Sequence, residues 1–220
     1  MKEDVIRLMV VDDHPIVLQG TQALLAEIED IEVVGLANNG KEAVALNKTL
    51  KPDVILMDLI MPEMDGIEAI NQIIAEYPDT KILVLTSFIT DDRVFPAIKA
   101  GALGYLLKDS IPNELVRAIR KVHRGEPALH PSIARKILQD IQEVSPEEEV
   151  SIEPLTDREV EVLQLVAKGR DNQDIAEKLV IAEVTVRTHI SRILNKLHLA
   201  NRVQASLYAL RHGLIDLDDQ

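Results

Sequence analysis

The stretch Val54-Ile55-Leu56-Met57-Asp58 decides the fold, because an apolar run of strand length ends abruptly in a carboxylate. Burying an unpaired charge is costly, so the run must deliver Asp58 to a surface. Asp12 and Asp13 end an earlier apolar run in the same way, and Lys108 ends a later one. Charged side chains at the carboxyl ends of different strands predict a single site at one edge of a parallel sheet.

Strand-like and helix-like patterns alternate five times in the first 125 residues. Apolar runs predict strands near residues 6–11, 31–36, 54–57, 82–85 and 103–107, and amphipathic segments predict helices near residues 15–28, 40–50, 67–77, 93–100 and 113–124. Runs that are apolar on both faces and separated by helices are typical of a parallel sheet covered on both sides. We therefore expect residues 1–125 to form a doubly wound, five-stranded α/β domain of the flavodoxin-like type.

The composition of the 220-residue chain, with 46% hydrophobic and 28% charged residues, is typical of a globular protein with real cores. There are no cysteines, which excludes disulfides and thiolate metal sites and fits a reducing cytosol. The amino-terminus lacks the features of a signal peptide, and no apolar run approaches the ~20 residues of a membrane span. We expect a cytoplasmic protein without a membrane partner.

The net charge of −13 argues against nucleic-acid binding, but the charge is unevenly distributed. Residues 1–150 carry 15 Lys+Arg against 26 Asp+Glu, whereas residues 154–213 carry 9 against 7. The two parts are therefore expected to do different jobs. Between them, residues 126–153 fit a linker, with a short helix opened by Pro131 and Ser132 and an acidic, solvated stretch over residues 143–153.

Residues 154–220 have a purely helical pattern, which predicts an all-α domain of four helices. Thr156 and Glu159 fit a capping box at the start of the first helix, which ends at Gly169. A short second helix follows Asp171, a third covers residues 183–197, and a fourth lies between residues 201 and 213. The short helix, the turn at residues 180–182 and the longer helix suggest a helix-turn-helix.

Three acids and one base supply the chemistry of the predicted sheet-edge site. Asp12, Asp13 and Asp58 repel one another if all are ionised without a counter-ion, and such hard oxygen ligands suit Mg²⁺. Asp58 is also a candidate nucleophile for a phosphoryl group, with Lys108 and Mg²⁺ neutralising its charge. Thr86 ends the fourth predicted strand, where it can bond to phosphoryl oxygens. Any one acid alone is better explained as an ordinary loop carboxylate, but the whole set at the right strand ends favours a phosphoryl site.

The third helix of the carboxyl-terminal part has an apolar stripe that includes Val186, Ile190 and Ile193. That stripe directs polar side chains outward, namely Arg187, Thr188, Ser191, Arg192 and Asn195. Basic side chains neutralise phosphates, and Arg can read guanine edges. On charge alone, a solvated face of an ordinary helical module is the simpler interpretation.

Residues 5–125 resemble a two-component receiver domain, through the motifs at residues 11–14, 58–66, 85–87 and 107–108. The resemblance implies that Asp58 accepts phosphate from a histidine kinase. It implies that Asp13, Asp58 and the Ile60 carbonyl hold Mg²⁺ directly, with Asp12 acting through water. It also implies that Thr86 moves toward the phosphoryl group and that Tyr105 changes rotamer with it, although plain packing explains a single Tyr equally well. His14, ahead of Pro15, is interpreted as the opening of the first helix rather than as a metal ligand.

The carboxyl-terminal part resembles a LuxR-type DNA-binding domain, through residues 155–163, 172–176, 185–189 and 193–197. With the receiver, the whole chain resembles a response regulator of the NarL/FixJ type. The resemblance implies that the third helix enters the major groove of double-stranded DNA and that the last helix dimerises there, as a homodimer when phosphorylated. It implies DNA contacts by Thr185, Arg187, Thr188, Ser191, Arg192 and Lys196.

The sequence departs from the LuxR-type pattern at three positions. Asp171 and Ala182 stand where the family usually has Ser. Asp171 can still cap its helix, whereas Ala182 cannot, at a cost of ~1 kcal/mol. Ser191 occupies a position that is basic in some members, so fewer charged base contacts are available.

The resulting hypothesis is a phosphorylation-dependent transcription regulator and not an enzyme. A haloacid-dehalogenase-like phosphatase would need a second Asp two residues after Asp58, where this chain has Ile60, which cannot transfer protons. The remaining alternative is a constitutive DNA-binding dimer with an unswitched receiver.

Overall fold

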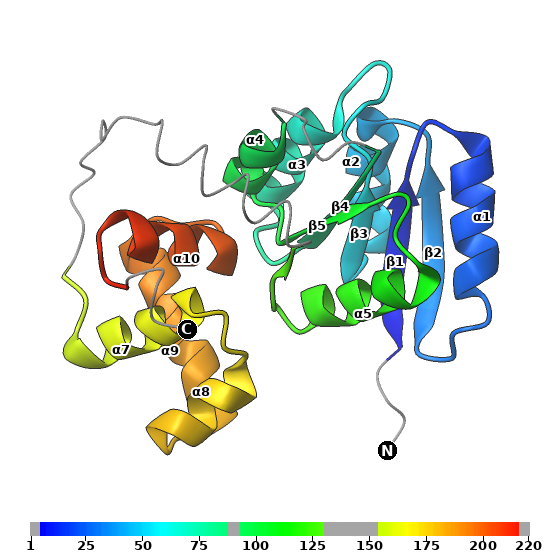
Figure 1. Ribbon diagram of the computed structural model, residues 1–220. Helices are drawn as coiled ribbons and strands as arrows, with labels where there is room; N and C mark the ends of the chain where they lie inside the picture. Colours follow the sequence, from blue (N-terminus) through cyan, green and yellow to red (C-terminus); the bar gives the residue numbers. More distant parts are fainter. Residues whose placement is uncertain (1–4, 88–92, 130–153, 216–220) are drawn as a thin grey trace. The chain divides into compact units, whose positions relative to one another are not determined.

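The computed structural model describes residues 5–87, 93–129 and 154–215. The chain divides into two compact units, an α/β unit over residues 1–136 and a helical unit over residues 137–220 (Figure 1). The helix predicted near Pro131 and the acidic stretch of residues 143–153 lie outside the described residues. Among the helices that are described, none has the length and hydrophobicity that crossing a membrane requires.

The α/β unit is built on a parallel sheet with the strand order β2-β1-β3-β4-β5-β6. The strands are β1 (Ile6–Val11), β2 (Ile31–Ala37), β3 (Val54–Met57), β4 (Lys81–Thr86), β5 (Gly104–Leu107) and β6 (Ala128–Leu129). The α/β fold is confirmed, but the expected count of five strands is one too few. The sixth strand is two residues long and lies where we expected linker, because so short a segment has no periodicity to reveal it.

Helices join the strands and cover both faces of the sheet. They are α1 (Pro15–Leu25), α2 (Gly40–Leu50), α3 (Gly66–Glu76), α4 (Val94–Ala100) and α5 (Pro112–His123). Helix α2 packs against α3 and α3 against α4, while α5 lies across the sheet (Figure 1). All residues of β3 and β5 are buried, which explains why these strands are apolar on both faces.

The register of the sheet brings several strand ends to the same level. Val11 of β1 pairs with Met57 of β3, and Met57 pairs with Val84 of β4. The strand order reverses at β1, between its neighbours β2 and β3. Ligands of open α/β sheets bind at such a switch point, beyond the carboxyl ends of the strands.

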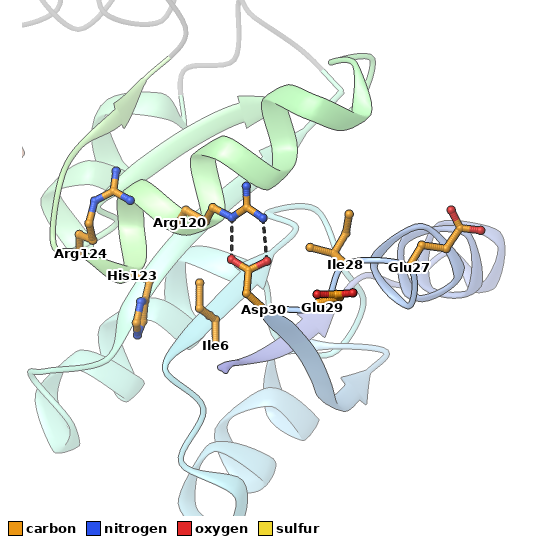
Figure 2. Close-up of a pocket in the computed structure, with 8 residues that line it drawn as sticks. All are labelled: Ile6, Glu27, Ile28, Glu29, Asp30, Arg120, His123 and Arg124. Atoms are coloured by element: carbon orange, nitrogen blue, oxygen red, sulfur yellow. Dashed lines mark hydrogen bonds and ion pairs between the residues drawn. The ribbon is translucent and has the colours of Figure 1, made fainter. Parts of the chain in front are cut away.

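At the amino-terminal ends of the strands, Asp30, just before β2, forms an ion pair with Arg120 of α5. The guanidinium makes two bonds to the carboxylate, each 2.7 Å long, in a hollow that also includes Ile6 and His123 (Figure 2). The Arg120 hydrogen bond lowers the pKa of Asp30. This two-bond ion pair holds α5 against the edge of the sheet, and the charges of Asp30 and Arg120 neutralise each other.

The helical unit contains α7 (Asp157–Ala167), α8 (Asn172–Leu179), α9 (Glu183–Lys196) and α10 (Arg202–Arg211), which confirms the four-helix prediction for the part of the unit that is described. Their shared core includes Val162, Leu163, Ile175, Val186 and Ile193. Both predicted caps are present: Thr156 and Glu159 form the capping box, and Asp171 accepts a hydrogen bond from the Asp174 amide. Helix α9 has Ala182 at its N-cap and therefore lacks a side-chain cap, as expected.

Candidate functional site

The predicted acid-and-base site forms at the carboxyl ends of β1, β3 and β5. The Asp58 amide donates to the Val11 carbonyl over 2.9 Å, which holds the residue beside the end of β1. The Lys108 Nζ lies 2.8 Å from the Asp58 Oδ2 and 2.6 Å from the Asp12 Oδ2. Asp12 and Asp58 are 1% and 5% exposed, so one ammonium group joins two buried carboxylates.

Asp13 and His14 complete this cluster. The His14 Nδ1 lies 2.6 Å from the Asp13 Oδ1, and one ligand atom each from Asp12, Asp13, His14 and Asp58 all lie within 4.8 Å of one another. His14 precedes Pro15 at the start of α1, as expected, but its closeness to Asp13 was not anticipated. The Asp13 Oδ1 is buried, with the His14 imidazole beside it. A buried carboxylate oxygen among other carboxylates fits a hard divalent cation such as Mg²⁺.

The charges of this cluster are not balanced. Burial raises the pKa of Asp58, and the Asp12 charge adds to that rise, although Lys108 and the Leu59 amide oppose it. For Lys108, burial opposes the charged form, but its hydrogen bonds to Asp12 and Asp58 outweigh burial and raise its pKa. Lys108 contacts two of the three carboxylates, and Asp13 lies beside His14 instead, so a bound cation would reduce the repulsion within the cluster.

The loop after β3 is fixed tightly behind Asp58. The Leu59 amide donates to the Asp58 Oδ1 over 2.8 Å, and the fully buried Leu59 accepts from the Gly66 amide at 3.0 Å. A Cβ on Gly66 would overlap the Asp58 carbonyl, so glycine is needed for α3 to start this close. Ile60, whose carbonyl is the fourth expected metal ligand, lies in the same loop and is 45% exposed.

The two residues expected to switch both lie on strands beside this site. Thr86 ends β4, next to β3, and is 1% exposed. The Thr86 carbonyl accepts a hydrogen bond from the Lys108 amide over 2.7 Å, so a backbone hydrogen bond holds Thr86 next to Lys108. Tyr105 of β5 is fully buried and pairs with Val84 and Leu129. Their roles in switching stay predictions.

In the helical unit, α9 presents the predicted polar face to solvent. Arg187, Thr188, Ser191 and Arg192 are exposed, and Thr185 is half-buried. Arg187 pairs with Glu183 one turn earlier, with the Nη2 and Oε1 atoms 2.5 Å apart. Four of the six predicted DNA contacts therefore lie on an accessible helix surface.

Lys196 is placed differently from the other predicted DNA contacts. Its Nζ lies 2.7 Å from the Oε2 of Glu159, a carboxylate only 3% exposed. The Lys196 hydrogen bond, with bonds from Thr156, lowers the pKa of Glu159 to about 2. Sequence reasoning missed this pair. Lys196 follows Ile193 by three residues and so flanks the buried stripe, which was the available signal.

Comparisons with known proteins match both units. A model of the response regulator receiver domain matches residues 8–120, and a model of bacterial regulatory proteins of the luxR family matches residues 153–209. The chain is 50% identical to the transcriptional regulatory protein LiaR of Bacillus subtilis (strain 168), over 96% of this chain and 100% of that protein. It is 44% identical to the response regulator protein VraR of Staphylococcus aureus (strain NCTC 8325 / PS 47), over 96% of this chain and 99% of that protein.

Solved structures agree with these relatives. The response regulator ChrA of a heme-sensing two-component system is 34% identical, with a TM-score of 0.54 and coverage of 96% of this chain and 100% of that chain. A structure of two RcsB dimers bound to two parallel DNAs is 28% identical, with a TM-score of 0.56 and coverage of 94% and 98%. With matches to both domains and along nearly the whole length of its relatives, the chain belongs to the NarL/LuxR family of two-component response regulators, which are phosphorylatable transcription regulators.

Proposed function

We propose that Asp58 accepts a phosphoryl group from a histidine kinase, with Mg²⁺ as cofactor, and that this event switches a homodimer to tighter binding of double-stranded DNA. The observation that carries the proposal is the unbalanced cluster at the switch point of the sheet. The Lys108 ammonium contacts Asp12 and Asp58 there, while the third carboxylate, Asp13, has its Oδ1 buried with the His14 Nδ1 2.6 Å away. A further cation close by would reduce the repulsion among these carboxylates.

The residues that would hold Mg²⁺ are Asp13, Asp58 and the Ile60 carbonyl, with Asp12 acting through water. When bound, the ion would neutralise the carboxylates and the charge on the transferring phosphoryl group. The donor set is made of oxygen atoms, which are the ligands that Mg²⁺ prefers.

Asp58 is held in place for attack by two contacts. The Leu59 amide fixes one carboxylate oxygen and Lys108 the other, at 2.8 Å each. An Asp58 oxygen forms the new bond to phosphorus while the bond from phosphorus to the kinase histidine nitrogen breaks, and the imidazole leaves with that electron pair. The Lys108 ammonium can then turn toward the phosphoryl oxygens, where Thr86 is the expected hydroxyl donor.

Exposed apolar residues near the site residues in the sequence are consistent with a protein as phosphoryl donor. Ile16, at the start of α1, is 85% exposed, and Ile111, just before α5, is 60% exposed. With Ile60 they place apolar side chains close in sequence to Asp13, Lys108 and Asp58. If these side chains form one apolar patch beside the cluster, it would suit docking of the kinase.

The exposed face of α9 supports the DNA-binding part of the proposal. Arg187, Thr188, Ser191 and Arg192 are exposed on the longer helix of the helix-turn-helix, the one that enters the major groove in such motifs, and the RcsB relative has been solved as dimers on DNA. Lys196 would reach a phosphate only by leaving Glu159. We therefore expect Arg187 to contribute more to DNA affinity than Lys196.

Phosphoryl transfer is tested by intact-protein mass spectrometry after treatment with acetyl phosphate. We expect the wild-type protein to gain one phosphoryl group only when Mg²⁺ is present, and Asp58→Asn to gain none. Asp109→Asn is the matched control, because it removes an exposed carboxylate beside Lys108 and should be labelled normally. Normal labelling of Asp58→Asn would show that another residue is the acceptor.

A further inference from the structure

Val184 is an exposed apolar residue that the fold of the helical unit does not use. It is 68% exposed at the second position of α9, two residues before the buried Val186. At 100° per residue, this spacing places Val184 on the side of the helix away from the core stripe. Val is also a weaker helix former than Arg, Lys, Gln or Glu, so its presence does not serve the stability of α9.

Thr188 extends this apolar surface along the helix. It lies four residues after Val184, which makes the two side chains neighbours on one face. The Thr188 hydroxyl donates to the Val184 carbonyl over 3.0 Å. That bond occupies the hydroxyl proton at the helix backbone and leaves a methyl group as the other branch of the side chain. The face flanked by Arg187 therefore offers methyl groups as well as charge.

The apolar group that the major groove offers is the 5-methyl of thymine. In a helix-turn-helix, the amino-terminal residues of the recognition helix are the ones that contact base edges. Val184 is such a residue. Resting on the DNA binding proposed above, we propose that Val184, together with the Thr188 methyl, reads the 5-methyl of a thymine in each half-site. Specificity at that base pair then comes from apolar contact. This fits a helix in which Ser191 replaces the basic residue that some family members have at this position.

The test removes only the methyl group from the DNA. A preferred site is first selected from random double-stranded DNA with the full-length, acetyl-phosphate-treated protein, and each thymine is then replaced by deoxyuridine. We expect one deoxyuridine position per half-site to weaken wild-type binding by about fourfold, the factor that corresponds to ~0.8 kcal/mol for one buried methyl-sized group. Fluorescence anisotropy of labelled duplexes measures the affinities.

Matched variants assign the effect to Val184. Val184→Ala should bind the thymine duplex more weakly and respond little to deoxyuridine. Val180→Ala is the control, because Val180 is 89% exposed but lies in the turn before α9, and this variant should keep the full response. If the wild-type protein binds DNA but deoxyuridine has no effect, or if the effect is undiminished in Val184→Ala, this inference is wrong while the proposed DNA binding still stands. Absence of any DNA binding would overturn the proposed function as well.

Discussion

Each of the two units buries a carboxylate against a lysine, and the two pairs behave in opposite ways. Asp58 and Lys108 lie 2.8 Å apart in the α/β unit, and Glu159 and Lys196 lie 2.7 Å apart in the helical unit. Both carboxylates are almost fully buried. Yet the pKa of Asp58 is raised, whereas that of Glu159 is lowered to about 2.

The difference lies in what surrounds each pair. Glu159 has an ammonium to itself and also accepts hydrogen bonds from the Thr156 amide and hydroxyl. Asp58 shares its ammonium with Asp12 and accepts one backbone bond. Burial is the largest cause of the raised pKa of Asp58, and the Asp12 charge adds to it, whereas the Lys196 hydrogen bond outweighs burial at Glu159. Distance alone therefore does not separate a pair that stabilises the fold from a cluster that suits a ligand.

Removing the balanced carboxylate should have the larger effect on stability. Glu159→Gln should lower the free energy of unfolding of the helical unit by about 2–4 kcal/mol at pH 7, because a buried ion pair loses one partner. Glu159 has a folded-state pKa of about 2 against an ordinary 4.5, so its contribution is fully present above pH 4.5 and is lost as the pH falls toward 2. Urea unfolding at several pH values, followed by hydrogen exchange in peptides of α7 and α9, measures the difference.

Glu161→Gln is the matched control for this prediction. Glu161 lies on the same helix and pairs with Arg158 at the surface, so its loss should cost less than about 1 kcal/mol. A Glu159→Gln variant that is as stable as this control at neutral pH would remove the contrast between the two pairs.

Asp13→Ala tests the α/β unit in the same way, and we expect it to change the free energy of unfolding less than Glu159→Gln does. Removing one carboxylate from the unbalanced cluster relieves repulsion, so the metal-free protein should become slightly more stable, by up to about 1 kcal/mol. The variant should also bind Mg²⁺ about tenfold more weakly or worse, because a direct ligand is lost. Isothermal titration with Mg²⁺ and urea unfolding in chelator measure the two effects. Unchanged Mg²⁺ affinity would show that Asp13 is not a ligand.

The convergence of Asp12, Asp58 and Lys108 could be predicted from the sequence, because each follows an apolar run and parallel strands deliver their carboxyl ends to one edge. The pairing of Lys196 with Glu159 could not be deduced in the same way. It depends on how α9 packs against α7, between residues 37 positions apart. Strand β6 was missed for a related reason, since two residues acquire their structure only by pairing with β5.

The measurement that tests the account most directly is the DNA affinity of the full-length protein with and without acetyl phosphate and Mg²⁺. The duplex is the selected site, and wild type is compared with Asp58→Asn. We expect phosphorylated wild-type protein to bind more tightly and as a dimer, and Asp58→Asn to keep the unphosphorylated affinity under both conditions. Equal affinity of labelled and unlabelled wild-type protein would contradict the account and favour a constitutive DNA-binding dimer.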